Sequence, residues 1–144
     1  MLNESMFIQC RRRYLYGRFH TCGLSISEGI VMLVLGHGGC QNQDTLAQRS
    51  GIDKYRLARV LRELERRGLV ERRLNARNRR EKQVDLSETG RTLAQELRTV
   101  MDDWNRLLFT GFTEAERKEV RVLFGRMMAN ISLNDEKLAR EMTK

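Results

Sequence analysis

Basic side chains concentrate in one stretch of this sequence, between Asp53 and Lys82. The stretch has twelve Lys or Arg and five Asp or Glu residues, a net charge of +7 (twelve minus five) in a chain of net charge +8. Lysine and arginine donate hydrogen bonds to phosphate oxygens, and arginine can donate two to a guanine edge. Charge concentrated in this way attracts a polyanion and releases its counterions. The first interpretation is a nucleic-acid-binding surface built from Lys54, Arg56, Arg59, Arg62, Arg66, Arg67, Arg72, Arg73, Arg77, Arg79, Arg80 and Lys82.

Residues that could perform catalysis are few and poorly placed. The histidines, His20 and His37, lie near expected helix ends without a paired nucleophile, and there is no phosphate-cradling loop. The three cysteines, Cys10, Cys22 and Cys40, have no CxxC or metal-ligand spacing, so they indicate neither a disulfide framework nor a zinc site. We therefore expect no enzyme activity, no metal and no cofactor, and we expect reduced thiols.

The elements that position the basic residues are expected to be helices. With 144 residues, no proline and 6% aromatic residues, the composition favours one compact, mostly α-helical protein. Apolar periodicity predicts a first helix over residues 4–19, and Ser27 is expected to cap a second, buried helix that ends near Gly36. A short third helix over residues 42–49 and a fourth from the cap Asp53 to residue 67, joined by a glycine turn, predict a helix-turn-helix.

The fourth helix has one apolar side and one basic side. Leu57, Val60, Leu61 and Leu64 fall within one stripe at the 3.6-residue period and are expected to pack inward. In a helix that enters the major groove, the amino-terminal turns reach the base edges, whereas later residues meet phosphates. The alternative is a solvated basic face with ion pairs such as Glu63 to Arg67. The DNA-contacting interpretation assigns base edges to Lys54, Tyr55, Arg56 and Arg59, and phosphates to Arg62 and Arg66.

Two short strands are expected after the fourth helix, over residues 69–73 and 83–86, separated by a basic loop. A helix-turn-helix followed by a two-stranded hairpin is a winged helix. The sequence therefore predicts a mostly α fold with a small β-hairpin wing, in which Arg77, Arg79 and Arg80 lie near the wing tip.

Four short segments stand out along the winged-helix region: Leu-Ser-Ile-Ser at 24–27, Leu-Ala at 46–47, Leu-Glu-Arg-Arg-Gly-Leu-Val-Glu-Arg at 64–72 and Leu-Ser-Glu-Thr-Gly at 86–90. In their order and spacing, these segments resemble the multiple-antibiotic-resistance regulator (MarR) family of transcription factors. The resemblance implies a homodimeric, DNA-binding regulator whose wing arginine enters the minor groove. Arg80 matches that arginine, but the usual aspartate two residues earlier is replaced by Asn78, which offers only a neutral hydrogen bond.

The carboxy-terminal third carries more apolar surface than a small winged helix can bury. Ser87 is expected to cap a long helix, and the capping box at 113–116 opens another with a wide apolar stripe. We expect residues 1–22 and 91–144 to form a dimerisation region around a DNA-binding domain at 23–90. The alternative is a monomeric helical core. The interface candidates are Phe124, Met127, Met128 and Ile131, and a homodimer would bind a pseudo-palindromic operator.

The input to such a regulator is less clearly marked. The resemblance implies a small aromatic or phenolic effector, yet no motif fixes one. Cys10, with Tyr14 one turn later, has the spacing of a peroxide-sensing branch of the family, but its place on the apolar stripe favours a buried, inert thiol. We expect a sequence-specific dimeric repressor released by a small-molecule effector. The alternatives are a redox-sensing regulator through Cys10 and a non-specific architectural DNA-binding protein.

No stretch of the sequence approaches the roughly 20 apolar residues that span a bilayer, and the first residues lack the basic and apolar regions of a signal peptide. We therefore expect a cytoplasmic protein with no membrane partner.

Overall fold

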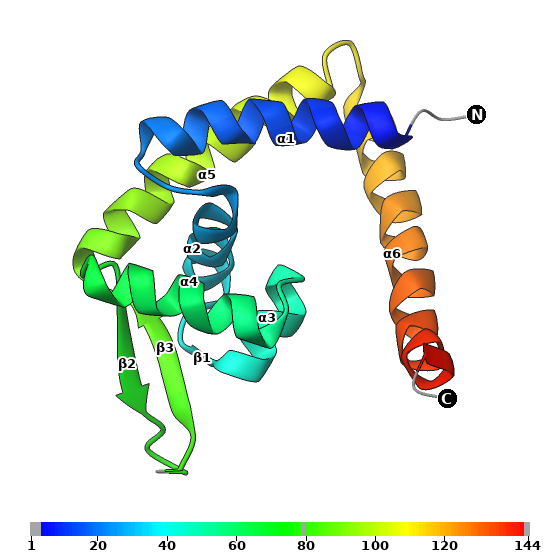
Figure 1. Cartoon of the computed structure of the whole chain (residues 1–144). Helices are drawn as coiled ribbons and strands as arrows, with labels where there is room; N and C mark the ends of the chain where they lie inside the picture. The colour runs from blue at the N-terminus through cyan, green and yellow to red at the C-terminus, as the bar shows by residue number, and fades with distance from the viewer. Residues whose placement is uncertain (1–3, 79, 143–144) are drawn as a thin grey trace. The chain divides into compact units, whose positions relative to one another are not determined.

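The computed structural model describes residues 4–78 and 80–142, with side chains described up to residue 131. The chain divides into two compact units, Met1–Trp104 and Asn105–Lys144. Most of the secondary structure is helical, and the described strands form one small antiparallel sheet (Figure 1). The expected mostly α fold with a winged helix-turn-helix is confirmed.

Four complete helices, most of a fifth and the sheet build the first unit. Its helices are α1 (Glu4–Thr21), α2 (Ile26–Gly38), α3 (Gln43–Ser50), α4 (Lys54–Arg66) and α5 (Glu88–Leu108) as far as Trp104. One continuous core includes Phe19, Met32, Leu46, Leu61 and Leu97, contributed by all five helices. Burying each such side chain stabilises the folded state by about 1.5–3 kcal/mol relative to leaving it in water.

Ser25, and not Ser27, caps α2. The Ser25 hydroxyl accepts a hydrogen bond from Glu28 N at 3.2 Å, and the Glu28 carboxylate accepts one from Ser25 N at 2.9 Å. This is a capping box, which requires Glu or Gln three residues after the capping Ser or Thr. Ser27 is followed at that distance by Ile30, and it is buried in the first turn of the helix. The expectation for Ser27 was therefore wrong, although the sequence contained the signal for Ser25.

The sheet has three strands where the sequence predicted two. The hairpin strands β2 (Val70–Leu74) and β3 (Lys82–Leu86) pair as expected, and the short β1 (Gln41–Asn42) pairs with the other edge of β3. A two-residue strand is too short to leave a periodic pattern in the sequence. Figure 1 shows β2 and β3 extending beyond the helices as a wing.

Small residues join α4, β2 and α5. Gly68, with a positive φ of 70°, ends α4, and its carbonyl accepts a hydrogen bond from the Ser87 hydroxyl at 2.6 Å. The same hydroxyl accepts a bond from Gly90 N at 3.0 Å and so caps α5, as predicted. A Cβ at Gly90 would lie 2.0 Å from the carbonyl oxygen of Leu69, so only glycine fits there without moving the backbone.

The second unit contains the end of α5, a turn at Gly111 and α6 (Glu114–Met142). The predicted capping box of α6 is present: Thr113 Oγ1 accepts from Glu116 N at 3.2 Å, and the Glu116 carboxylate accepts from Thr113 N at 2.7 Å. Hydrogen bonding of the Glu116 carboxylate, first to the backbone N–H of Thr113 and then to its hydroxyl, lowers the pKa of Glu116 because it favours the ionised form.

Within the described residues, no single helix is long and apolar enough to cross a membrane; the pair α1 and α2, bent by 83°, passes the same test when taken together.

Candidate nucleic-acid interface

The fourth helix presents its basic residues outward, as its periodicity predicted. Asp53 accepts a hydrogen bond from Arg56 N at 2.9 Å and caps α4. Leu57, Leu61 and Leu64 are buried, and Val60 is partly buried against the core. The opposite side is exposed, and Tyr55 is 88% exposed. We call the exposed set the recognition face; it consists of Lys54, Tyr55, Arg56, Arg59 and Arg62.

Ion pairs divide the basic residues into two groups. Arg66 binds Glu63 at 2.6 Å, and Arg67 donates to the carbonyl of Gly23 at 2.9 Å with Glu28 3.6 Å away. Other basic side chains with acidic partners are Lys54 (Asp44), Arg72 (Glu65) and Arg73 (Glu71 and Asp85). Glu63 therefore pairs with Arg66 and not with Arg67, the partner that the alternative interpretation named, because Arg67 turns toward α2.

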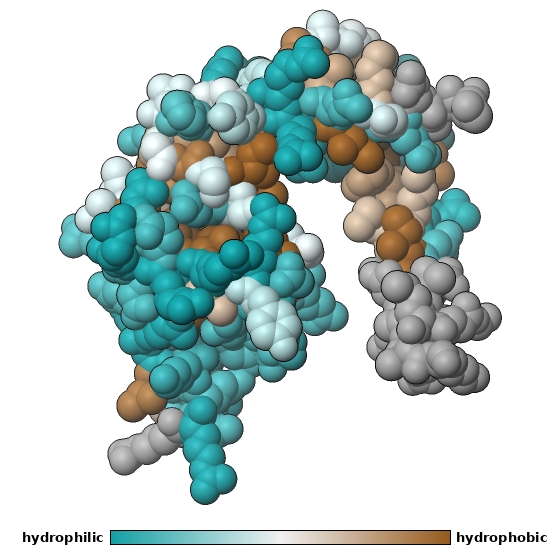
Figure 2. Space-filling model, viewed as in Figure 1, coloured by the Kyte–Doolittle hydropathy of each residue, from teal (hydrophilic) through white to brown (hydrophobic). Residues whose placement is uncertain are grey.

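The second group has no acidic partner within the described residues. It contains Arg56, Arg59 and Arg62 on the recognition face, and Arg77, Arg80 and Lys82 in the wing. Arg62 donates a long hydrogen bond to the carbonyl of Ala58 at 3.4 Å. Figure 2 shows mainly hydrophilic side chains over α4 and the wing on the face that it presents. Within the basic stretch at 53–82, the described side chains that lack an acidic partner therefore lie on the two elements that a winged helix applies to DNA.

The turn at the wing tip is built by asparagines. Asn75 Oδ1 accepts from Arg77 N at 3.0 Å, and Asn78 Oδ1 accepts from Arg80 N at 3.2 Å. Asn78 thus orients the backbone at Arg80, and not its guanidinium. Arg79, the remaining predicted wing contact, lies outside the described residues.

A glutamate beside Arg80 connects the wing to the helix-turn-helix. One carboxylate oxygen of Glu81 accepts a hydrogen bond from the side-chain amide of Asn42, and the other accepts one from the amide of Asn75 at 2.6 Å. Asn42 also caps α3, since its Oδ1 accepts from Thr45 N at 2.8 Å. Sequence reasoning missed this cluster; Asn42 could have been recognised as a cap, but nothing in the sequence pattern pairs it with Glu81.

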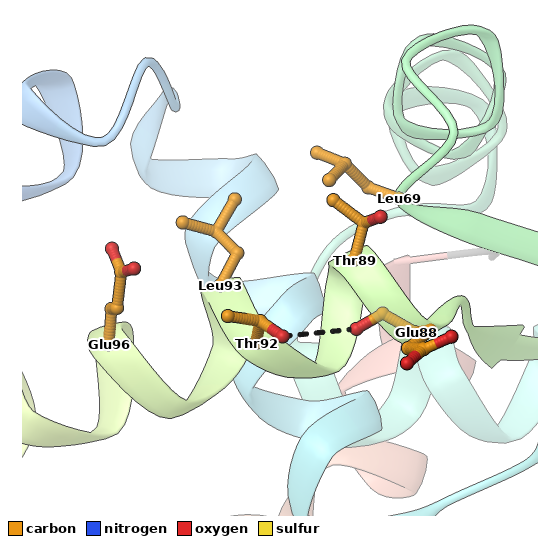
Figure 3. A pocket seen from close by; sticks show the side chains of 6 residues that line it. All are labelled: Leu69, Glu88, Thr89, Thr92, Leu93 and Glu96. Atoms are coloured by element: carbon orange, nitrogen blue, oxygen red, sulfur yellow. Dashed lines mark hydrogen bonds between the residues drawn. The ribbon is translucent and has the colours of Figure 1, made fainter.

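A shallow pocket of about 460 Å³ lies at the start of α5 (Figure 3). Its lining combines apolar side chains, threonines and two glutamates: Leu69, Glu88, Thr89, Thr92, Leu93 and Glu96. The carboxylates of Glu88 and Glu96 would repel a negatively charged ligand. The pocket therefore does not suit the aromatic anions that the resemblance suggested as effectors.

The thiols differ in their surroundings. Cys10 is exposed in the single chain, whereas the sequence favoured a buried thiol. Tyr14, one turn later, packs on Trp104 with ring centroids 5.2 Å apart and lies beneath the Arg18 guanidinium at 4.9 Å. Burial, followed by the charge of Glu96, raises the pKa of Cys22. Burial and the charge of Asp85 raise the pKa of Cys40, although Arg73 partly opposes this.

The described residues contain no group of three His, Cys, Asp or Glu side chains that could hold a metal ion.

The predicted dimerisation residues are exposed in the single chain. Phe124 is 57% exposed, and Met127, Met128 and Ile131 are similarly accessible along α6. Apolar side chains are visible along the described part of this helix in Figure 2. The described chain alone therefore leaves a long apolar helix face in contact with solvent.

Comparison with known proteins identifies the same architecture. A family model described as MarR family matches residues 23–81. A crystal structure of MarR is 28% identical, with a TM-score of 0.75, over 92% of this chain and 90% of that one. A MarR transcriptional regulator from Methanosarcina mazei is 25% identical, with a TM-score of 0.77, over 88% and 91%. A mutant MarR from E. coli, complexed with operator DNA, shares the fold at 21% identity and a TM-score of 0.71, over 85% and 89%.

Proposed function

Because this chain belongs to the MarR family of transcriptional regulators, we propose that it is a homodimeric repressor that binds a pseudo-palindromic operator and is released by a small-molecule effector. The observation that carries the proposal is the distribution of unpaired basic side chains. Within residues 53–82, the described basic side chains without an acidic partner are Arg56, Arg59 and Arg62 on the recognition face and Arg77, Arg80 and Lys82 in the wing. Acidic partners are present for Lys54, Arg66, Arg67, Arg72 and Arg73.

The proposal gives each element a role. The amino-terminal turns of α4 read base edges in the major groove through Lys54, Tyr55, Arg56 and Arg59, and Arg62 meets phosphates. The wing enters the minor groove through Arg80, with further phosphate contacts from Arg77 and Arg79. Residues 23–90 thus form the DNA-binding domain.

Residues 1–22 and 91–144 supply the dimer contacts in this proposal. The exposed apolar side chains of α6 support it, because an apolar face of this length in water favours association. A two-fold symmetric dimer places two recognition faces about one DNA turn apart. The related structure with operator DNA supports DNA as the partner.

The effector is proposed to be a small aromatic molecule bound outside the acidic pocket of α5. A second candidate input is oxidation of Cys10, whose thiol is exposed in the single chain. The two inputs separate in one assay: an aromatic carboxylate should release bound DNA from the Cys10→Ser variant, whereas an organic peroxide should release it only from the parent chain.

Selection of bound sequences from random DNA tests the central proposal. A specific regulator should enrich an inverted repeat and prefer it over random DNA by at least roughly a thousandfold at fixed salt. Enrichment of no sequence, with binding set by salt alone, would identify an architectural protein instead.

A further inference from the structure

Asn42 takes part in two separate structural elements. Its carbonyl oxygen caps α3 through Thr45 N, and its amide nitrogen donates to Glu81, which directly precedes the wing strand β3. The Asn42 side chain therefore connects the start of α3 to the wing through two direct hydrogen bonds.

Every polar group of Glu81 makes a hydrogen bond. Its two carboxylate oxygens accept from the amides of Asn42 and Asn75, its carbonyl accepts from Asn75 N at 3.1 Å, and its N–H donates to Asn78 O at 3.0 Å. Hydrogen bonds to an ionised acceptor are about twice as strong as neutral ones. Arg80, the adjacent residue, is therefore attached to a backbone that is held on both sides.

We propose that Asn42, Asn75 and Glu81 form a wing clamp, a positioning site that fixes the angle of the wing relative to the helix-turn-helix and so sets where Arg80 meets the minor groove. This inference rests on the DNA binding proposed above. In this chain the acid at the wing tip is Glu81, because position 78 carries an amide whose oxygen is used by the backbone at Arg80.

The clamp affects DNA affinity through the fraction of molecules in which the wing has the orientation that binds DNA. If losing the clamp leaves about one tenth of the molecules with the wing correctly placed, the apparent affinity falls about tenfold. The recognition face is unaffected, so major-groove preference should be retained while contacts to the flanking minor groove are lost.

The charge change makes Glu81→Gln an informative variant. It raises the positive charge beside the DNA, and electrostatics alone would tighten binding. Loss of the clamp should instead weaken DNA binding. The NH₂ group of a glutamine at 81 would face the NH₂ group of Asn42 or Asn75, and two donors cannot form a hydrogen bond with each other. We expect binding to the selected operator to weaken about five- to tenfold.

Asn42→Asp is the reciprocal variant. Aspartate caps a helix as well as asparagine does, so α3 keeps its cap, but a carboxylate at 42 repels Glu81. The double variant Asn42→Asp/Glu81→Gln has the parent's net charge and restores the contact with donor and acceptor exchanged. Its affinity should return to within about twofold of the parent, a rescue that neither single change provides.

Backbone hydrogen exchange gives a readout independent of DNA. The amides of Asn75 and Glu81 should exchange faster in each single variant and at the parental rate in the double variant, whereas amides in the α2 core should be unchanged. A parent chain that selects no DNA overturns the proposed function, and the exchange pattern then still tests the clamp. Parental or tighter binding by Glu81→Gln, or a double variant no better than Asn42→Asp, overturns the clamp itself.

Discussion

Lys54 Nζ lies 2.9 Å from Asp44 Oδ1, so the first basic residue of the recognition face is paired with an acid of α3. A phosphate or base edge must therefore compete with Asp44 for this ammonium group. Both side chains are exposed, and an exposed ion pair contributes little to the stability of the fold because water and salt screen the attraction between its charges.

Releasing Lys54 should strengthen DNA binding. Asp44→Asn should tighten binding about two- to threefold at low salt, and the gain should disappear at high salt. Asp102→Asn, an equal charge change at an exposed position of α5, serves as the control. Identical effects of the two changes in fluorescence titrations would show that only net charge matters.

Arg56 and Arg59 should carry base recognition. Replacing either by alanine should cost about 1–3 kcal/mol on the operator and relax preference at the base pair it contacts, without changing thermal stability, because both side chains are exposed. Arg98→Ala in α5 is the matched control. Unchanged specificity in both variants would count against groove entry by this face.

Arg80 should account for the base-sequence preference in the flanking minor groove. Arg80→Ala should weaken binding by at least about 1 kcal/mol and reduce selectivity for A·T-rich flanks, whereas Arg77→Ala should weaken binding evenly across sequences. Asn78→Asp keeps the oxygen that accepts from Arg80 N and adds an ionic partner, so binding should be equal or tighter. The minor-groove role is wrong if Arg80→Ala binds like the parent on all flanks.

The exposed face of α6 should be needed for assembly. Phe124→Asp with Met127→Asp should produce monomers by sedimentation and abolish high-affinity operator binding, although the recognition face is unchanged. Lys118→Asp, at an exposed polar position of the same helix, should leave the dimer intact. A folded double variant that remains dimeric would place the interface elsewhere, and a folded monomer with full affinity would separate dimerisation from recognition.

The thiols should differ in reactivity. A raised pKa means that less thiolate is present at a given pH, so Cys22 and Cys40 should be alkylated more slowly at pH 8 than free cysteine. Their rates should rise with pH beyond the point where the rate for free cysteine levels off. Single-cysteine variants followed by mass spectrometry measure this directly, and rates equal to that of free cysteine would contradict the effect of burial.

Features that depend on local sequence were predictable. The 3.6-residue period of α4 separated its buried leucines from its basic side, and the caps at Asp53, Ser87 and Thr113 follow from well-defined side-chain patterns. The wing followed from two apolar stretches on either side of a basic loop.

Features that depend on contacts between distant residues were not predictable. The strand β1 exists because β3 offers it an edge, and the Asn42–Glu81 contact joins residues 39 positions apart. The exposure of Cys10 also depends on distant contacts. The apolar periodicity of α1 shows which residues share a helix face, but it does not show whether other parts of the chain pack on that face.

The junction at Ser87 and Gly90 has a mechanical consequence. The contacts Gly68 O to Ser87 Oγ, at 2.6 Å, and Ser87 N to Leu69 O, at 3.1 Å, involve backbone atoms and the shortest hydroxyl side chain. A relative displacement of about 1 Å would break them, because hydrogen bonds weaken steeply beyond about 3.5 Å. The end of α4 and the start of α5 are therefore expected to move together, so that a tilt of α5 would displace the helix that we propose to contact DNA.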